Sequence, residues 1–349
     1  MTTTTTSVTT GPRTPANGAA LSICNLTVTL PASEGRPAVP LVRDVSLEVR
    51  PGECLGIVGE SGAGKSLTCY AALGLVQRSG LAVEGEVALM GRRISGLSQR
   101  ELMKVRGDQI SIIFQEPSVS LDPSYTVGNQ IAEVVRWHKG GTRRAAWERT
   151  IECLQLAGVP NPERRAKEYP HTLSGGLRQR AMIALAISCE PEVLIADEAT
   201  TALDVTIQAQ ILSLLRDLRD RLGMALIVVT HDLGVVADSC EQVAVMYGGQ
   251  VVESGPVDQI FHSPTHPYTQ GLLDSMPSMI GRSSAIRHIA GVVPPADLTL
   301  PGCRFAPRCT HTTAECVAAP PALERSGPSQ WSRCVRHDQI ELRGVRGDH

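Results

Sequence analysis

The chain has 349 residues, which is enough for a sizeable hydrophobic core and for more than one domain. Its 33 Lys and Arg residues and 35 Asp and Glu residues give a formal net charge of -2, which excludes a global electrostatic attraction to nucleic acid or to an anionic membrane. No uncharged apolar run approaches the roughly 18–20 residues that a membrane-spanning helix needs.

The N-terminal segment, residues 1–20, is rich in Thr, Gly and Pro, and this composition predicts a disordered tail. The segment lacks the basic start and apolar core of a signal peptide, so we expect the chain to stay in the cytosol. Thiols are normally kept reduced there, and the 10 cysteines are therefore not presumed to form disulfides.

Two strand-like segments, Leu21–Leu30 and Pro40–Val49, follow and are separated by turn residues. The apolar run Cys54–Val58 is short enough to be a buried parallel strand. It leads into a segment that fits the phosphate-binding pattern G-x-x-x-x-G-K-[ST], and residues 66–75 then have a helical pattern. The phosphate-binding segment consists of Gly59, Glu60, Ser61, Gly62, Ala63, Gly64, Lys65 and Ser66.

This strand–loop–helix context predicts a nucleotide site. The glycines let the backbone turn so that successive N–H groups point at phosphate oxygens, and the helix N-terminus adds partial positive charge. We expect Lys65 to reach the β- and γ-phosphates and the Ser66 hydroxyl to hold Mg²⁺.

Further strands are predicted at 83–89 and 110–114, and helical spacing then dominates a predicted insertion at about 116–189. Within the insertion, Leu173-Ser174-Gly175-Gly176 combines a serine N-cap, two glycines and a helix N-terminus. This is a second anion-binding arrangement. It carries no metal-binding carboxylate, so we expect it to cover a phosphate whose metal is held elsewhere.

Three predicted strands end in polar side chains that can act on the nucleotide. The strand before Gln115 is one, the apolar run 193–196 ends at Asp197 and Glu198, and residues 224–230 end at His231. The carboxyl ends of parallel strands are where α/β folds bind ligands. We expect Asp197 and Gln115 to hold Mg²⁺, Glu198 to polarise the attacking water, and His231 to contact the γ-phosphate.

Six ordered motifs over residues 21–260 resemble those of the ATPase subunits of ATP-binding-cassette (ABC) transporters. The resemblance implies an α/β fold, namely a P-loop NTPase (RecA-like) core with an antiparallel β subdomain and a helical signature subdomain. In the family's terms, the motifs are the Walker A at 59–66, the Q-loop at Gln115, the signature at 173–176, the Walker B at 193–198, the D-loop at 202–204 and the H-loop at His231.

The resemblance also implies a head-to-tail dimer with a second ATPase subunit, in which each of two ATP molecules binds one subunit's Walker A and the other's signature. The residues implied to serve the partner's ATP are Leu173, Ser174, Gly175, Gly176, Gln179 and Asp204. Dimer closure would drive two membrane permease subunits, which the family contacts near residues 115–125. This implies a peripheral protein on the cytoplasmic face of the membrane, with a solute-binding protein as an indirect partner and no nucleic acid.

Two positions depart from the family pattern. Leu30 stands where family members usually place an aromatic ring that stacks on adenine, so we expect weaker or less base-selective binding. Ala199 follows Glu198 where proline is more usual, and this should loosen the turn slightly.

Composition shifts after residue 260 towards Pro, His and Cys, and this predicts a C-terminal extension at 261–349. Residues 262–269 and 302–309 resemble the extension of oligopeptide and dipeptide importer ATPases, some of which carry a [4Fe–4S] cluster. By that resemblance, the tentative cluster ligands are Cys303, Cys309, Cys316 and Cys334. Their spacing alone names no metal, and zinc, free thiols or a disulfide remain alternatives.

The sequence therefore predicts an ATP- and Mg²⁺-dependent subunit of an importer for oligopeptides, dipeptides or a related solute such as nickel. One alternative is a soluble ABC ATPase that serves translation control or DNA repair. Another is a mainly regulatory subunit in an asymmetric pair, although Glu198 and His231 are both present.

Overall fold

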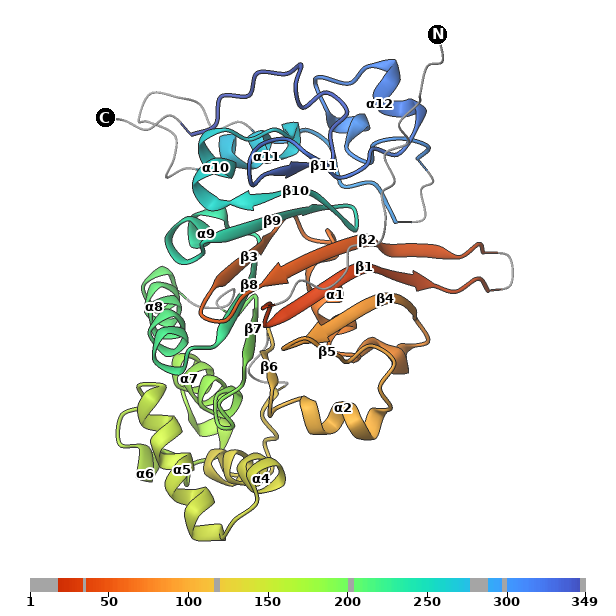
Figure 1. Ribbon diagram of the computed structural model, residues 1–349. Coiled ribbons are helices and arrows are strands. Elements are labelled where there is room, and N and C mark those ends of the chain that lie inside the picture. The colour runs from red at the N-terminus through yellow and green to blue at the C-terminus, as the bar shows by residue number, and fades with distance from the viewer. Residues whose placement is uncertain are drawn as a thin grey trace.

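The computed structural model describes residues 18–33, 36–115, 120–199, 204–276, 288–296 and 300–345. Most of the predicted disordered tail, at 1–17, lies outside these residues, as do Ala202 and Leu203 of the predicted D-loop. Figure 1 shows a central sheet flanked by a second sheet, a helical region and a C-terminal extension.

The central sheet has eight strands in the order β11-β12-β10-β9-β3-β8-β7-β6. Strands β9, β3, β8, β7 and β6 run parallel, and β10, β12 and β11 continue the sheet antiparallel. Strands β3, β7 and β8 are buried along their whole length, as expected of parallel strands covered on both faces. The bounds are β3 Cys54–Val58, β6 Ile110–Ile113, β7 Val193–Asp197, β8 Ala225–Thr230, β9 Gln242–Tyr247, β10 Gln250–Pro256, β11 Glu324–Arg325 and β12 Trp331–Ser332.

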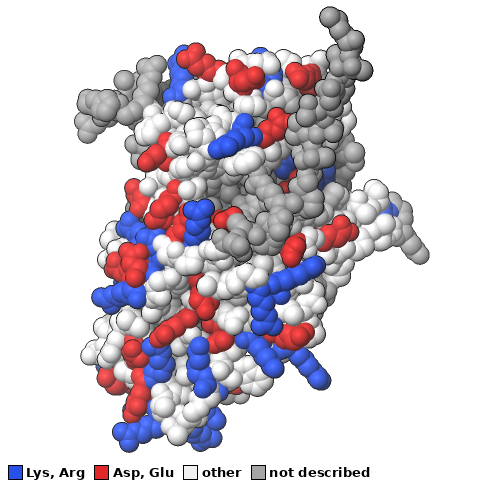
Figure 2. All heavy atoms as spheres, in the orientation of Figure 1, with Lys and Arg blue, Asp and Glu red and all other residues white. Residues whose placement is uncertain are grey.

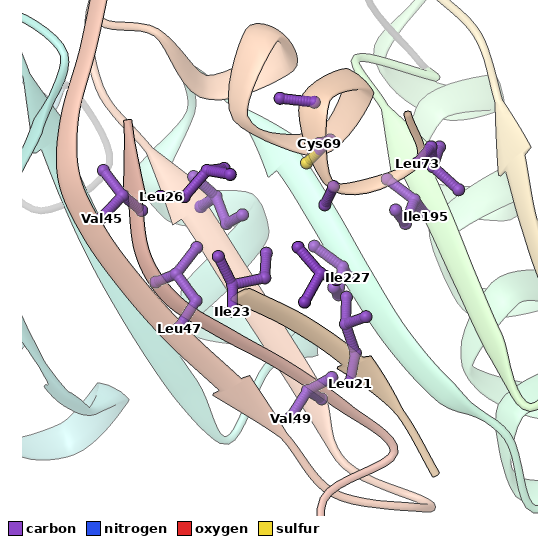
Figure 3. Packing of buried hydrophobic residues seen from close by; sticks show 14 of the residues in the cluster. Leu21, Ile23, Leu26, Val45, Leu47, Val49, Cys69, Leu73, Ile195 and Ile227 are labelled. Atoms are coloured by element: carbon purple, nitrogen blue, oxygen red, sulfur yellow. The ribbon is translucent and has the colours of Figure 1, made fainter. Parts of the chain in front are cut away.

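A four-stranded antiparallel sheet, in the order β2-β1-β4-β5, lies beside the central sheet. Its inward residues, including Leu21, Ile23 and Leu47, pack with Ile195 and Ile227 of the central sheet and with helix α1 to form one core (Figure 3). The elements of this part are β1 Leu21–Leu30, β2 Val39–Val49, β4 Ala82–Leu89, β5 Arg92–Arg93, α1 Lys65–Ala72, η1 Val76–Ser79 and α2 Gln99–Val105. The predicted strands and the predicted antiparallel subdomain are thus present.

The helical region lies between β6 and β7 in the chain and projects from one end of the molecule (Figure 1). Its buried apolar side chains pack with side chains of β7, β8 and helix α8 in a second hydrophobic core. The helices of this region are α4 Val127–Lys139, α5 Arg143–Leu156, α6 Pro162–Arg165, η2 Pro170–Thr172 and α7 Gly175–Ala186. Helix α8 Val205–Leu222 follows β7 in the chain, and helix α9 Leu233–Ser239 follows β8.

The C-terminal extension packs against the central sheet and adds strands to it. Strand β12 pairs with β10, and the buried carboxylate of Glu253 on β10 accepts hydrogen bonds from Thr265 and Gln330. The extension also shares a core with β9 and α9. Its helices are α10 Val257–His262, α11 Pro267–Asp274, η3 Ala306–Arg308 and α12 Ala314–Ala318.

Candidate nucleotide site

The phosphate loop connects the end of β3 at Val58 to the start of α1 at Lys65. Gly59 and Gly64 have φ angles of 154° and 94°, a region that L side chains rarely adopt. A Cβ atom on Gly59 would lie 2.2 Å from the carbonyl oxygen of Met246, so only glycine fits there. The loop conformation is therefore fixed by its glycines and by the adjoining strand β9.

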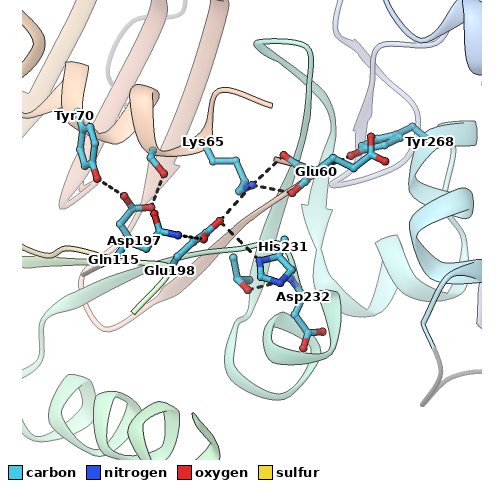
Figure 4. A network of polar contacts seen from close by, with 12 residues as sticks. Glu60, Lys65, Tyr70, Gln115, Asp197, Glu198, His231, Asp232 and Tyr268 are labelled. Atoms are coloured by element: carbon cyan, nitrogen blue, oxygen red, sulfur yellow. Dashed lines mark hydrogen bonds and ion pairs between the residues drawn. The ribbon is translucent and has the colours of Figure 1, made fainter. Parts of the chain in front are cut away.

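Lys65 lies inside this loop, with only 5% of its surface exposed. Its ammonium donates to the carbonyls of Gly59, at 2.8 Å, and Glu60, at 3.1 Å, and lies 3.9 Å from the Glu198 carboxylate (Figure 4). Burial lowers the pKa of Lys65, and the carboxylates of Glu198 and Asp197 oppose this effect. The lysine is thus a nearly buried positive group at the loop that the sequence assigns to phosphate.

Asp197 ends β7 and is 1% exposed. Its two oxygens accept hydrogen bonds from the Ser66 hydroxyl, at 2.7 Å, and the Tyr70 hydroxyl, at 2.6 Å. Burial raises the pKa of Asp197, and these two hydrogen bonds act in the opposite direction. The hydroxyl of Ser66 and a buried carboxylate are hard oxygen ligands of the kind that Mg²⁺ prefers, so these residues fit the ion that the family implies.

Tyr70 was not expected in the site. It lies one helical turn after Ser66 on α1, so both hydroxyls lie on the same helix face and reach the same carboxylate. The i, i+4 spacing of Ser66 and Tyr70 in a predicted helix was the feature of the sequence that could have indicated Tyr70 as a site residue.

Glu198 follows the strand in a left-handed conformation, with φ of 45°, which is strained for a residue other than glycine. Its backbone N–H donates to the carbonyl of Val229 at 2.9 Å and holds this turn. The side chain accepts a hydrogen bond from Gln115 at 2.7 Å, and its other oxygen lies 3.8 Å from Nδ1 of His231 (Figure 4). The structure thus brings together Gln115, Glu198 and His231, which the sequence placed at the ends of three strands.

The predicted signature segment precedes and begins α7. Ser174 is the N-cap and accepts a hydrogen bond from the N–H of Leu177, Leu173 is buried, and Ser174 and Gly175 are exposed. Asp204 is likewise exposed and caps α8 through a hydrogen bond from Ile207. Among the described residues, none of the hydrogen bonds of Ser174 reaches the phosphate loop.

Gln179, which the resemblance assigns to a partner's ATP, is buried in this chain. Its side chain is 1% exposed, and its Nε2 atom has no hydrogen-bond partner among the residues that the structure describes. It lies beside Met182 and Ile183 on the buried part of α7. Its assignment to a partner's ATP stays a prediction.

Leu30 lies at the end of β1 and is 48% exposed, so its apolar surface is open to a ligand. Ala199 is 7% exposed and lies just after the Glu198 turn.

The four cysteines of the extension line one small hollow, together with Phe305 and His311. Burial raises the pKa of Cys303, Cys309 and Cys334, and it raises that of Cys334 to about 11. The hollow measures about 20 Å³, roughly the room of one water molecule. Within the described ranges, no group of three or more His, Cys, Asp or Glu side chains is arranged to hold a metal ion, so the predicted iron–sulfur cluster is not supported.

Other predictions about thiols and charge can be compared with the structure. Five of the six remaining cysteines are buried, and Cys240 is half-buried beside Cys54. In the view of Figure 2, acidic and basic side chains are interspersed over the molecule. None of the helices in the described part of the chain is both long and apolar enough to cross a membrane.

The chain is similar to known proteins over both of its parts. It matches the ABC transporter family at residues 42–201, and the family described as oligopeptide/dipeptide transporter, C-terminal region, at residues 252–316. It is 49% identical to a probable peptide ABC transporter ATP-binding protein of Sinorhizobium fredii, over 85% of this chain and 89% of the relative. It is 45% identical to the oligopeptide transport ATP-binding protein AppD of Bacillus subtilis, over 86% of this chain and 92% of the relative.

A solved structure has the same cassette. It is a dimeric ATP-binding cassette in a post-hydrolysis state with bound ADP and Pi, and it aligns with a TM-score of 0.60 at 29% identity. The alignment covers 68% of this chain and 98% of that one. The phosphate loop, the strand-end residues and these likenesses lead to one conclusion: the chain belongs to the ATP-binding subunits of ABC transporters and is an ATPase.

Proposed function

We propose that this ATPase energises the import of oligopeptides or dipeptides. The observation that carries the proposal is that one chain combines the nucleotide site with an extension that matches the C-terminal region of oligopeptide/dipeptide transporters. The relatives named above carry peptide transport in their names and span nearly the same length.

In the proposed reaction, Lys65 and the backbone N–H groups of the loop bind the phosphates of ATP. Ser66, Asp197 and Gln115 would provide oxygen ligands for Mg²⁺, and the ion would neutralise phosphate charge. Glu198 accepts a proton from the water that attacks the γ-phosphorus while the bond to the ADP oxygen breaks. The contact of 3.8 Å between His231 and Glu198 suits a role for the histidine in positioning that carboxylate and the γ-phosphate.

The second half of each ATP site comes from another ATPase subunit in this proposal. Ser174 and Gly175 are exposed and Gly176 is half-buried at the N-terminus of α7, which is a suitable contact for a phosphate. Leu173 supports this segment from the core, and Asp204 lies exposed at the start of α8. A dimer of cassettes is the state named for the solved relative.

The membrane permease is proposed to contact a groove between α4 and α5. The groove has a volume of about 830 Å³ and is lined by Tyr125, Trp147, Arg136 and Glu133, among others. Tyr125 is 57% exposed and ends the loop that the family uses for such contacts. Aromatic rings with charges around them suit a short amphipathic segment, and docking there would hold the subunit at the cytoplasmic face of the membrane.

Co-purification from membranes tests the proposal. We expect the tagged chain to bring down two membrane proteins and a second ATPase, and the complete transporter to take up peptides with its solute-binding protein. Arg136→Glu in the groove should lose the membrane proteins, whereas Arg221→Glu, also exposed but on α8, should retain them. Recovery of ribosomes or DNA in place of membrane proteins would contradict the transport function.

The iron–sulfur cluster stays a hypothesis. Its support is that four thiols surround one hollow, and the small volume of that hollow weighs against it. Anaerobic purification followed by absorbance and iron analysis decides the matter, because a colourless, iron-free, folded protein removes the cluster.

A further inference from the structure

The C-terminal extension reaches the phosphate loop through one ion pair. The guanidinium of Arg308, on η3, makes two hydrogen bonds to the carboxylate of Glu60, at 2.6 and 3.0 Å. Glu60 is the second residue of the phosphate loop, and the two partners are 248 residues apart in the chain. The Arg308 side chain is 4% exposed and the Glu60 side chain 30% exposed, so water screens this pair less than a surface pair.

A second contact from the extension reaches the same loop residue. The hydroxyl of Tyr268, on α11, accepts a hydrogen bond from the backbone N–H of Glu60 at 2.9 Å. The carbonyl of Glu60 accepts from Lys65 at 3.1 Å (Figure 4). The backbone N–H, the carbonyl and the side chain of this residue are therefore all bonded, two of them to the extension.

Arg308 is itself held firmly. It donates to the carbonyls of Ala290, at 2.9 Å, and Ile289, at 3.3 Å, and its guanidinium lies 5.7 Å from the centre of the Tyr247 ring. The rings of Tyr247 and Tyr268 contact each other at 4.7 Å between centroids, and both pack on Phe305. A rigid aromatic base thus fixes the direction from which the guanidinium meets the loop.

We propose that Arg308 and Tyr268 are positioning residues for ATP binding, through which the extension holds the phosphate loop in its binding conformation. The inference rests on the assignment of residues 59–66 to ATP. The loop binds phosphate with N–H groups whose directions depend on its backbone, so fixing Glu60 reduces the ordering that binding must otherwise supply. Arg308 directly precedes Cys309, which lines the cysteine hollow. A rearrangement of that hollow would therefore move Arg308 and change its contact with Glu60 in the phosphate loop.

The test measures the affinity of the full-length chain for a fluorescent ATP analogue, together with KM and kcat. We expect Arg308→Ala and Glu60→Gln each to weaken affinity about tenfold, and Arg308→Lys, which keeps the charge but not the two-pronged geometry, to recover part of it. The double variant should be no weaker than either single one, because both remove the same interaction. KM should rise more than kcat falls.

The matched control is Asp44→Asn. Asp44 also forms an ion pair with an arginine of the extension, Arg333, at 3.5 Å, but it lies on β2 and outside the phosphate loop. We expect this variant to bind the analogue like the wild type. Unchanged affinity in Arg308→Ala, or additive losses in the double variant, would overturn the proposal, provided that melting temperatures show folded protein. If Lys65→Ala also leaves affinity unchanged, the ATP assignment of the loop is what has failed.

Discussion

The two halves of the nucleotide machinery in this chain are built very differently. On the phosphate-loop side, buried or half-buried charged groups are tied together: Lys65 to the loop, Asp197 to Ser66 and Tyr70, and Glu198 to Gln115. On the signature side, Ser174 and Gly175 are exposed and the Ser174 side chain bonds only within its own helix cap. Contacts within this chain hold the side chains of the phosphate-loop half, whereas the helix N-terminus of the signature half lies at the surface. This difference fits the proposal that the first half binds ATP within one chain and that the second half contacts the ATP of a neighbouring subunit.

The largest effect is expected from substitution of the proposed base, Glu198, on the phosphate-loop side. Glu198→Gln keeps the size of the side chain and removes the base, so ATP binding should persist while turnover falls by about a hundredfold or more. Single-turnover hydrolysis with equilibrium binding measures both quantities. Near-normal turnover would remove Glu198 from its role.

A slightly smaller effect is expected from the signature side. Ser174→Asp keeps the helix cap but places a negative charge where we propose a partner's phosphate, so turnover should fall by about thirtyfold. Binding of ATP to the isolated chain should not change. Ser174→Asn, which caps equally well without charge, is the control and should retain most activity. Weakened ATP binding by the isolated Ser174→Asp chain would contradict the division into two halves.

Tyr70→Phe sharpens the account of the phosphate-loop side. It removes a hydrogen bond to the buried Asp197 carboxylate and leaves the ring in place, so we expect the Mg²⁺ concentration for half-maximal activity to shift by about three- to tenfold. Titration of ATPase activity with Mg²⁺ measures the shift. An unchanged titration would show that the tyrosine does not position Asp197.

The smallest effect concerns stability. Because burial raises the pKa of Asp197 in the folded protein, the folded state loses stability as pH rises from the unfolded pKa through the folded one. Asp197→Asn does not titrate there, so at pH 7.5 its melting temperature should exceed that of the wild type by about 2 °C, and the gap should shrink in acid. A variant that melts lower at pH 7.5 would contradict this reading.

Much of the phosphate-loop side could be predicted from the sequence. Buried parallel strands deliver their C-terminal residues to one sheet edge, so Gln115, Asp197, Glu198 and His231 could be expected to lie together. No sequence pattern predicts the left-handed turn at Glu198, because the turn depends on a hydrogen bond from its N–H to the carbonyl of Val229 on the neighbouring strand β8.

The remaining differences come from packing that sequence spacing does not encode. The resemblance assigns Gln179 to the partner's ATP, and the sequence spacing did not show that this side chain is 1% exposed within α7. The pairing of Glu60 with Arg308 joins residues far apart in the chain and depends on how the extension folds back. The four cysteines that the resemblance groups as tentative cluster ligands line one hollow, and their spacing in the sequence could not fix its shape.

We propose that this chain binds ATP by itself and needs a second ATPase subunit to hydrolyse it. The direct test compares the wild-type chain, diluted until light scattering shows a monomer, with the same chain in the intact transporter. We predict similar affinity for ATP but turnover at least about tenfold slower in the monomer. A monomer that hydrolyses ATP as fast as the transporter would contradict the claim.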